Sequence, residues 1–366
     1  MHKKIMKIIA AGLVAALLCF AAPAVADQAA PLQLTLPAAI ELALERSLDL
    51  QKAELELDAA ELAQRQAKSA ADDLPSQLAV SYDLKKVKEV YPYQARVMAE
   101  TAKGGVAQAK EGVRYGVTAA YYGVLRAEQA VTLAETALAR ANEQLRLAEL
   151  HFQAGMVAKT DVLEAQVQQA NAQAALLQAQ RGAEMARLGL NKALGLDLDT
   201  EIALTDELRP LELPEVDLDK IMALAMERRM DVLAARAAAE SADREADLAR
   251  RCYGEGTYVS KSALIAAEKA ALGLQQAERD ATLAVRQAYL DVLNAHDQLA
   301  IGEKALASAS ESMRLANLRY REGMATSFEV LSVQTLLAQA ENQALQNLFN
   351  YNLAVAGLRL AVGGEY

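Results

Sequence analysis

The chain has 366 residues and a formal net charge of −10, so it is acidic. An acidic chain without a basic cluster is a poor candidate for binding nucleic acid, because phosphates are recognised by clustered lysine and arginine. Hydrophobic residues make up 53% of the chain, yet it has no tryptophan and four phenylalanines. Alanine-rich chains with regular apolar spacing form close-packed helices rather than large aromatic cores.

The first residues have the features of an export signal. Three early lysines precede an apolar run over residues 8–22, and Ala-Val-Ala follows at residues 24–26. This pattern predicts a signal peptide over residues 1–26, cleaved after Ala26. Cleavage would remove three lysines and no acid, which moves the net charge from −10 to −13. Only Cys252 would remain, so the sequence excludes an internal disulfide framework.

An internal duplication organises the rest of the chain. AYYGVLRA at 120–127 recurs as AYLDVLNA at 288–295, and HFQAGMVAKTDVLEAQ at 151–166 recurs as RYREGMATSFEVLSVQ at 319–334, both 168 positions later. LALERSLDL at 42–50 recurs as LAMERRMDV at 224–232, an offset of 182, so the first copy carries 14 extra residues. The copies are expected at residues 27–194 and 220–366, joined by an acidic linker at 195–219.

Each copy is predicted to be a long helical hairpin, since no proline interrupts residues 93–209 or 215–366. Large residues recur every seven positions in each copy: Val124, Val131, Leu138, Leu145 and Phe152, then Val292, Leu299, Leu306, Met313 and Tyr320. A small residue stands three positions after each of the first four large residues of a copy. This spacing indicates left-handed supercoiling. A helix over 106–153 would be roughly 70 Å long. A turn at Gly155 or Gly323 follows, and a second helix returns.

Shorter helices at 39–72 and 217–250 are expected to lead into the two hairpins. Between the shorter and longer helices, apolar residues alternate with polar or small ones at 78–84 and again at 91–97, which predicts strands near 76–98. The equivalent place in the second copy, residues 251–260, has room for a tiny hairpin at most. The predicted fold class is therefore mainly α, with duplicated antiparallel hairpins and reduced β insertions.

This order of elements, present twice, resembles the TolC family of outer-membrane efflux and secretion channels. The most specific match is at the turns: AGMVAKTDVLEAQ at 154–166 and EGMATSFEVLSVQ at 322–334 each have a glycine, a short variable run and an acid-Val-Leu helix start. The resemblance covers most of residues 36–364. It implies a homotrimer in which each protomer contributes four helical strands to a twelve-helix periplasmic tunnel.

The resemblance also implies partners and a location. Periplasmic adaptor (membrane fusion) proteins would dock at the turns and an inner-membrane pump would feed the tunnel, which would be anchored at the cell outer membrane. The implied function is a passive exit duct for efflux or type I secretion. The chain departs from the family in its strand insertions, since a membrane strand needs ~9–11 residues and the insertion at 251–260 is too short for two.

That departure leaves a second function open, a structural barrel that spans or tethers envelope layers without a complete membrane pore. A periplasmic adaptor also uses long hairpins, but it would need a β-rich lipoyl-like module, and the sequence has none. No phosphate loop or catalytic constellation appears, so we expect no enzyme and no cofactor. His151, His296 and Cys252 lack partners at ligand spacing, so no metal site or catalytic thiol is expected.

Two groups of residues at the turns are candidates for function. By resemblance, the expected adaptor-docking residues are Gly155, Met156, Thr160, Gly323, Met324 and Ser327. The acids that begin the returning helices, Asp161, Glu164 and Glu329, would line the tunnel entrance, although Ser332 replaces the second acid of the second copy. The alternative is that these acids only cap their helices and offset the helix dipole. Tyr121, Tyr122 and Tyr289 share the seam and are expected to pack in the core or between subunits.

Overall fold

The computed structural model describes residues 32–214 and 217–365. The predicted signal peptide and its cleavage site lie outside these residues. The first copy contains β1 (Leu32–Leu34), α1 (Leu36–Arg46), α2 (Leu48–Asp72), α3 (Tyr82–Glu89), α4 (Tyr91–Gln153) and α5 (Lys159–Ala193). After β2 (Ile202–Leu204), the second copy contains α6 (Leu218–Arg228), α7 (Met230–Tyr253), α8 (Tyr258–Arg321) and α9 (Ser327–Val362).

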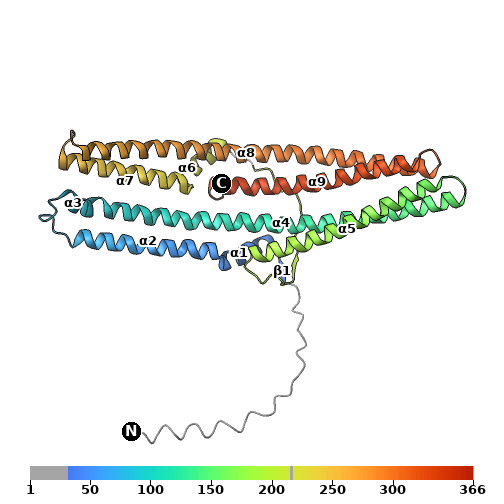
Figure 1. Ribbon diagram of the computed structural model, residues 1–366, viewed down its shortest axis with the longest axis horizontal. Helices are drawn as coiled ribbons and strands as arrows, with labels where there is room; N and C mark the ends of the chain where they lie inside the picture. The colour runs from blue at the N-terminus through green and yellow to red at the C-terminus, as the bar shows by residue number, and fades with distance from the viewer. Residues whose placement is uncertain (1–31, 215–216, 366) are drawn as a thin grey trace, which may run out of the picture.

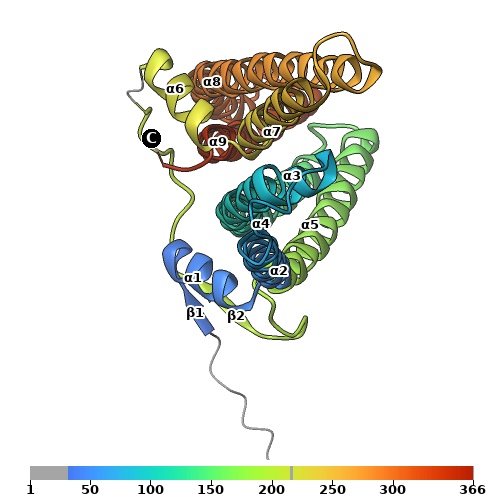
Figure 2. The ribbon, with the colours of Figure 1, turned by 90° about the vertical axis from the view of Figure 1, so that its left-hand side faces the viewer.

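The two longest helices, α4 and α8, span the molecule from end to end (Figure 1). They contain 63 and 64 residues, so each is about 95 Å long. Helices α2 and α5 lie one after the other along α4, and α7 and α9 do the same along α8. Helix α4 also packs against α7 and α9, which joins the hairpins side by side. Helix α8 therefore forms one edge of the protomer, and α2 with α5 forms the other (Figures 1 and 2).

The predicted seam is buried or half-buried between these helices, except at Phe152, which is 43% exposed. Val124 and Val292, equivalent positions of the repeat, are buried, as are the small residues Ala148 and Ala316. Gly302 shows why a small residue is needed, because a Cβ there would come within 2.6 Å of Asn347 Nδ2. Asn347 uses that amide to donate a hydrogen bond to the carbonyl of Gln298, at 2.7 Å. The heptad pattern thus identified the packed face of the long helices.

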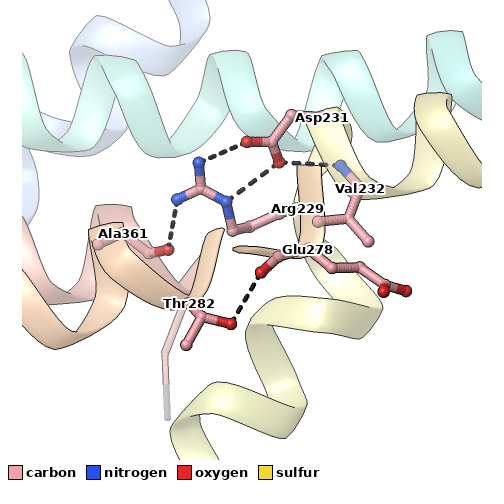
Figure 3. Close-up of polar contacts among 6 residues, drawn as sticks. All are labelled: Arg229, Asp231, Val232, Glu278, Thr282 and Ala361. Carbon is pink, nitrogen blue, oxygen red and sulfur yellow. Dashed lines mark hydrogen bonds and ion pairs between the residues drawn. The ribbon is translucent and has the colours of Figure 1, made fainter. Parts of the chain in front are cut away.

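Each short helix is broken once, where the sequence predicted a continuous helix. Ser47 separates α1 from α2 in an extended conformation, and its hydroxyl accepts a hydrogen bond from the N–H of Leu50. Arg229 separates α6 from α7 in the same way (Figure 3). Its guanidinium donates to the carbonyl of Ala361 at the end of α9 and, through two nitrogens, to the carboxylate of Asp231.

Residues 78–97, for which alternation predicted strands, are largely helical. Helix α3 covers Tyr82–Glu89, and its N-cap Ser81 accepts a hydrogen bond from the N–H of Leu84. Helix α4 begins at Tyr91, 15 residues before the predicted start, with Pro92 in its first turn, where no intrahelical N–H bond is lost. Residues 78–97 therefore close this end of the protomer with helices, and α3 packs against α2, α4 and α7. In the second copy, only residues 254–257 separate α7 from α8.

The linker contains a strand that the sequence pattern did not reveal. β2 pairs in parallel with β1, with Leu32 opposite Ile202 and Leu34 opposite Leu204. The buried hydroxyl of Tyr121 lies 3.0 Å from the carbonyl oxygen of Leu34 and 2.7 Å from Asp206 Oδ2. Burial, reinforced by the Asp206 carboxylate, raises the pKa of Tyr121 well above its ordinary value. The phenol therefore stays protonated and ties α4 to the linker.

Candidate functional site at the helical turns

The two hairpin turns have the same backbone geometry. Gly155 and Gly323 adopt left-handed conformations, with φ of 73° and 70°, as the sequence predicted. The next N–H in each turn reaches back to the helix it leaves: Met156 donates to the carbonyl of His151 at 2.9 Å, and Met324 to that of Arg319 at 2.8 Å. These bonds satisfy the last carbonyls of α4 and α8, and glycine avoids the steric cost of the left-handed conformation.

The turns expose apolar side chains at the extreme end of the molecule. Met156 is 66% exposed and Met324 is 63% exposed. Thr160 is also exposed, in the first turn of α5. Ser327, by contrast, is buried, and its hydroxyl has no hydrogen-bond partner among the described residues. Its neighbour Phe328 takes the exposed position, so the surface of the second turn is more apolar than the sequence suggested.

The acids that begin the two returning helices occupy equivalent positions but have different partners. Asp161 accepts a hydrogen bond from the N–H of Ala158, whose own side chain cannot cap α5. Glu329 pairs with Arg319 at 2.5 Å, and Thr326 caps α9 by accepting from the N–H of Glu329. Asp161 thus has a capping role, whereas Glu329 is an ion-pair partner across its own turn.

Glu164 and Ser332, also equivalent in the repeat, line the same groove between α5 and α9. This groove, hereafter the turn groove, has a volume of about 490 Å³. Leu163, Val167 and Phe328 give it exposed apolar walls. The hydroxyl of Ser332 donates a hydrogen bond to the carbonyl of Phe328. Glu164 is the one acid among the residues that line the turn groove.

The two turns are packed together through Tyr320. Its buried ring lies 5.2 Å from the ring of His151 in the other hairpin. Burial, and to a smaller extent the carboxylate of Asp161, raises the pKa of Tyr320 above its ordinary value. Because residues of both hairpins meet at this ring, the two turns form one surface.

The other residues that the sequence singled out are packed among neighbouring side chains or half-buried. His296 lies 5.8 Å from Tyr351, ring to ring, and Cys252 is half-buried near the end of α7. Tyr122 is buried in the core of the first hairpin, and Tyr289 packs against the core of the second. Within residues 32–214 and 217–365, no cluster of three His, Cys, Asp or Glu side chains is arranged to hold a metal ion. In the same part of the chain, no helix has the length and apolarity needed to cross a membrane.

Sequence reasoning missed two exposed apolar stripes on opposite edges of the protomer. Helix α2 exposes leucines seven positions apart: Leu48, Leu55 and Leu62. Helix α8 exposes a longer stripe, whose first and last members are ten helical turns apart at 3.6 residues per turn: Ile265, Leu272, Leu283, Leu290 and Ile301. Regular spacing was the signal that could have revealed both stripes.

Comparisons with known proteins agree with this architecture. The structure resembles a membrane protein from Pseudomonas aeruginosa (TM-score 0.77, 16% identity, 90% of each chain covered). It also resembles the outer membrane protein VceC from Vibrio cholerae (TM-score 0.75, 17% identity, 90% of this chain and 96% of that one). The Campylobacter jejuni CmeC outer membrane channel is similar as well (TM-score 0.75, 15% identity, 90% of this chain and 85% of that one). At these identities the likeness concerns the fold.

The sequence itself carries the family assignment. No curated protein matches the chain. Residues 93–196 and 257–364, however, match the profile of the family described as outer membrane efflux protein. These two segments include both long hairpins and amount to more than half of the chain. The chain therefore belongs to the outer membrane efflux protein family, and its resemblance to TolC family channels is confirmed.

Proposed function

We propose that the protein is a passive exit duct for efflux or type I secretion, assembled as a homotrimer that works with a periplasmic adaptor and an inner-membrane pump. Its family is one of channels rather than of enzymes. The observation that carries the proposal is the pair of exposed apolar stripes on α2 and α8. A single protomer leaves both stripes in water, although large apolar surfaces of this kind are normally covered by a partner.

Ring closure would cover both stripes at once. When the α2 edge of one protomer packs against the α8 edge of the next, every edge is used, and the contact is heterologous and cyclic. Four helices side by side per protomer then give twelve around a trimeric tunnel. Helix α2 ends and helix α8 begins at the same end of the protomer, so Leu55 and Leu272 lie at similar distances from that end (Figure 1). They are a suitable pair for cross-linking.

Disulfide trapping tests the trimer. The double variant Leu55→Cys with Leu272→Cys, in a Cys252→Ser background, should give a ladder of products that ends at three chains. A matched control, Leu198→Cys with Leu272→Cys, replaces the α2 residue by an exposed leucine of the linker and should give no ladder. A folded protein whose products stop at two chains, or extend beyond three, would contradict trimeric closure.

The turn acids are proposed to set the ion preference of the tunnel entrance. In a trimer, Asp161, Glu164 and Glu329 would place nine carboxylates near one mouth, and a low-dielectric wall would focus their field into the lumen. Arg319 offsets the charge of Glu329. We therefore expect Glu164→Gln to reduce cation preference and block by divalent cations in bilayer recordings more than Glu329→Gln does. Unchanged selectivity in both variants would leave these acids with a purely structural role.

The turn groove and the exposed methionines are the proposed adaptor-docking surface. A photo-reactive residue at Met156 or Met324 should form cross-links in cells to a periplasmic protein with its own helical hairpin, whereas one at Leu198 should not. Bilayer recordings also separate the duct from the alternative function, an envelope-spanning or tethering barrel. Trapped trimers that bind an adaptor but never conduct would favour the tethering barrel.

A further inference from the structure

A groove on the first hairpin has no role in the sites described above. It lies between α4, the second half of α5 and the linker up to β2, and its volume is about 990 Å³. We call it the linker groove. Asn191 ties the linker to α5 here, because its Nδ2 donates to the carbonyls of Leu198 and Thr200, at 2.8 and 2.9 Å. The linker thereby forms one wall of the groove, and the two helices form the others.

The linker groove is acidic. Five acids line it: Glu128, Glu135, Glu184, Asp199 and Glu201. Arg187 is the one basic residue in the lining, and it pairs with Glu128 at 2.7 Å. The other four carboxylates have no ion-pair partner in the part of the chain that the structure describes. The excess of acids does not depend on where the groove is bounded, since residues 128–135, 180–192 and 197–203 together contain six acids and three basic residues, a net charge of −3.

A buried acceptor in the linker groove also lacks a donor. Asn191 lines the groove and is 1% exposed, and its Oδ1 accepts no hydrogen bond from any described residue. An unpaired buried oxygen costs free energy, so nearly all such groups in folded proteins have a partner. The groove therefore combines unpaired carboxylates with an amide oxygen that needs a donor.

The equivalent place in the second copy is filled by the chain itself. Asn352 of α9 occupies the repeat position of Glu184, 168 residues later. It accepts a hydrogen bond from the N–H of Leu211 at 3.0 Å and donates to the carbonyl of Arg209 at 2.8 Å, so the linker lies against it. Leu348, one turn earlier, packs against the core of the first hairpin instead. By the repeat, Glu184 faces the linker side rather than the next protomer, and the proposed ring leaves the linker groove open.

The lining chemistry favours a ligand that donates hydrogen bonds and accepts none. Most side-chain donors of the groove are already used within the chain: Arg187 and Thr132 donate to Glu128, and Asn191 donates to the linker. A peptide would bring carbonyl groups that also need donors. A single metal ion is a poor match as well, because no three acids within residues 32–214 and 217–365 are arranged to hold one. Protonated amines spaced along a flexible chain suit separate acceptors, since an ammonium group has donors only.

We propose that the linker groove binds a linear polyamine, whose ammonium groups pair with Glu135, Glu184 and Asp199 and supply the donor that Asn191 Oδ1 lacks. Glu135 belongs to α4, Glu184 to α5 and Asp199 to the linker. A bound polyamine therefore holds the linker against the first hairpin, as Asn352 holds it against the second. The inference does not depend on whether the trimer conducts.

Calorimetric titration with spermidine tests the proposal. The full-length mature protein should bind spermidine, and binding should weaken at high salt because exposed charges are screened. The double variant Glu135→Gln with Glu184→Gln keeps the size of two exposed side chains and should raise the dissociation constant at least about fivefold. Bound spermidine should also slow hydrogen exchange over residues 197–203 in the wild type, which locates the site.

A matched control separates the linker groove from the general acidity of the chain. Glu149→Gln with Glu212→Gln removes the same charge at exposed positions outside the groove and should bind spermidine like the wild type. Unchanged binding in the Glu135→Gln, Glu184→Gln variant would overturn the proposal. So would magnesium chloride that displaces spermidine more than sodium chloride does at equal ionic strength, because the groove would then be a divalent-cation site. A lysine-rich peptide that binds the groove more tightly than spermidine would likewise contradict a polyamine site.

Discussion

The two hairpins have the same helix breaks, but different side chains stabilise these breaks. In both, the returning helix ends at a left-handed glycine that lies against the arginine before the helix break: Gly195 against Arg46, and Gly363 against Arg228. Where only a small residue fits, the two copies agree. The next residue in each copy differs, because Ser47 caps α2 with its own hydroxyl and Arg229 uses a guanidinium that reaches Asp231 and Ala361. The glycine after each returning helix is thus the same in both copies, while the side chain that stabilises the helix break differs between them.

The largest asymmetry that this comparison predicts is at Tyr121 and its equivalent, Tyr289. Tyr121→Phe removes a buried hydroxyl beside Asp206 and should lower the free energy of unfolding by about 1.5–3 kcal/mol, as for hydrogen bonds to charged groups. Tyr289→Phe should cost less than about 0.5 kcal/mol, because its hydroxyl donates to no described residue. Urea unfolding of both variants checks this, and equal losses would show that the two seams are energetically alike.

Variants at the two helix breaks should differ less in the free energy of unfolding that they lose. Arg229→Met removes the guanidinium that donates to the carboxylate of Asp231 and to the carbonyl of Ala361, although the N–H of Val232 still donates to Asp231. We therefore expect a loss of roughly 1–2 kcal/mol. Ser47→Ala removes only an N-cap and should cost about 1 kcal/mol. The same urea titration measures both, and Ser47→Thr, which keeps a capping hydroxyl, is the control. A larger loss in Ser47→Ala would reverse the order proposed here.

A smaller effect should appear as a pH dependence of stability that arises at the second helix break. Hydrogen bonds from Arg229 hold the pKa of Asp231 below its ordinary value of 3.8. An acid with a lowered folded-state pKa stabilises the fold above its unfolded pKa, and the stabilisation is lost as pH falls through the folded value. Asp231→Asn should therefore be less stable than the wild type at neutral pH, with the difference shrinking below about pH 4. Stability of the wild type and of Asp231→Asn measured across acidic pH tests this, and a pH-independent difference would contradict it.

The smallest predicted difference is between the two turns. Arg319→Gln breaks an exposed ion pair with Glu329 and should cost no more than about 0.2–1 kcal/mol. Hydrogen exchange should nevertheless become faster over residues 322–327, because Arg319 also reaches the carbonyl of Met324. His151→Gln, at the equivalent position, should speed exchange over 154–158 less, because it removes a ring contact with Tyr320 but no side-chain hydrogen bond to the turn. Matching changes in both turns would mean that the ion pair does not distinguish them.

Periodicity predicted the parts of the fold that depend on helix packing. Seven-residue spacing located the buried seam at Val124 and Val292, and glycine located both turns, because these signals depend on local geometry. The strand prediction at 78–97 failed because alternation over a few residues does not record that Ser81 caps a helix or that α7 covers it. The pairing of β2 with β1 was missed because its partner lies 170 residues away in sequence.

The candidate site was predictable in position but not in its chemistry. The residues of both turns were identified from the motif, whereas the burial of Ser327 and the pairing of Arg319 with Glu329 depend on contacts that form only when the turns fold. Equivalent acids looked interchangeable in the sequence. Their partners in space, Ala158 for one and Arg319 for the other, make them different.

The length of α4 and α8 gives the protomer a mechanical property. Ion pairs of Lys86 and Arg251 join the two hairpins at the end opposite the turns, about 95 Å away along α4 and α8. The contact between Tyr320 and His151 joins the hairpins again at the turns, so the protomer is one long body. A tilt of this body by about 5° about one end would displace the other end by about 8 Å, which is close to the distance between packed helix axes. A small change of orientation at one end is thereby enough to move the other end by the width of a helix.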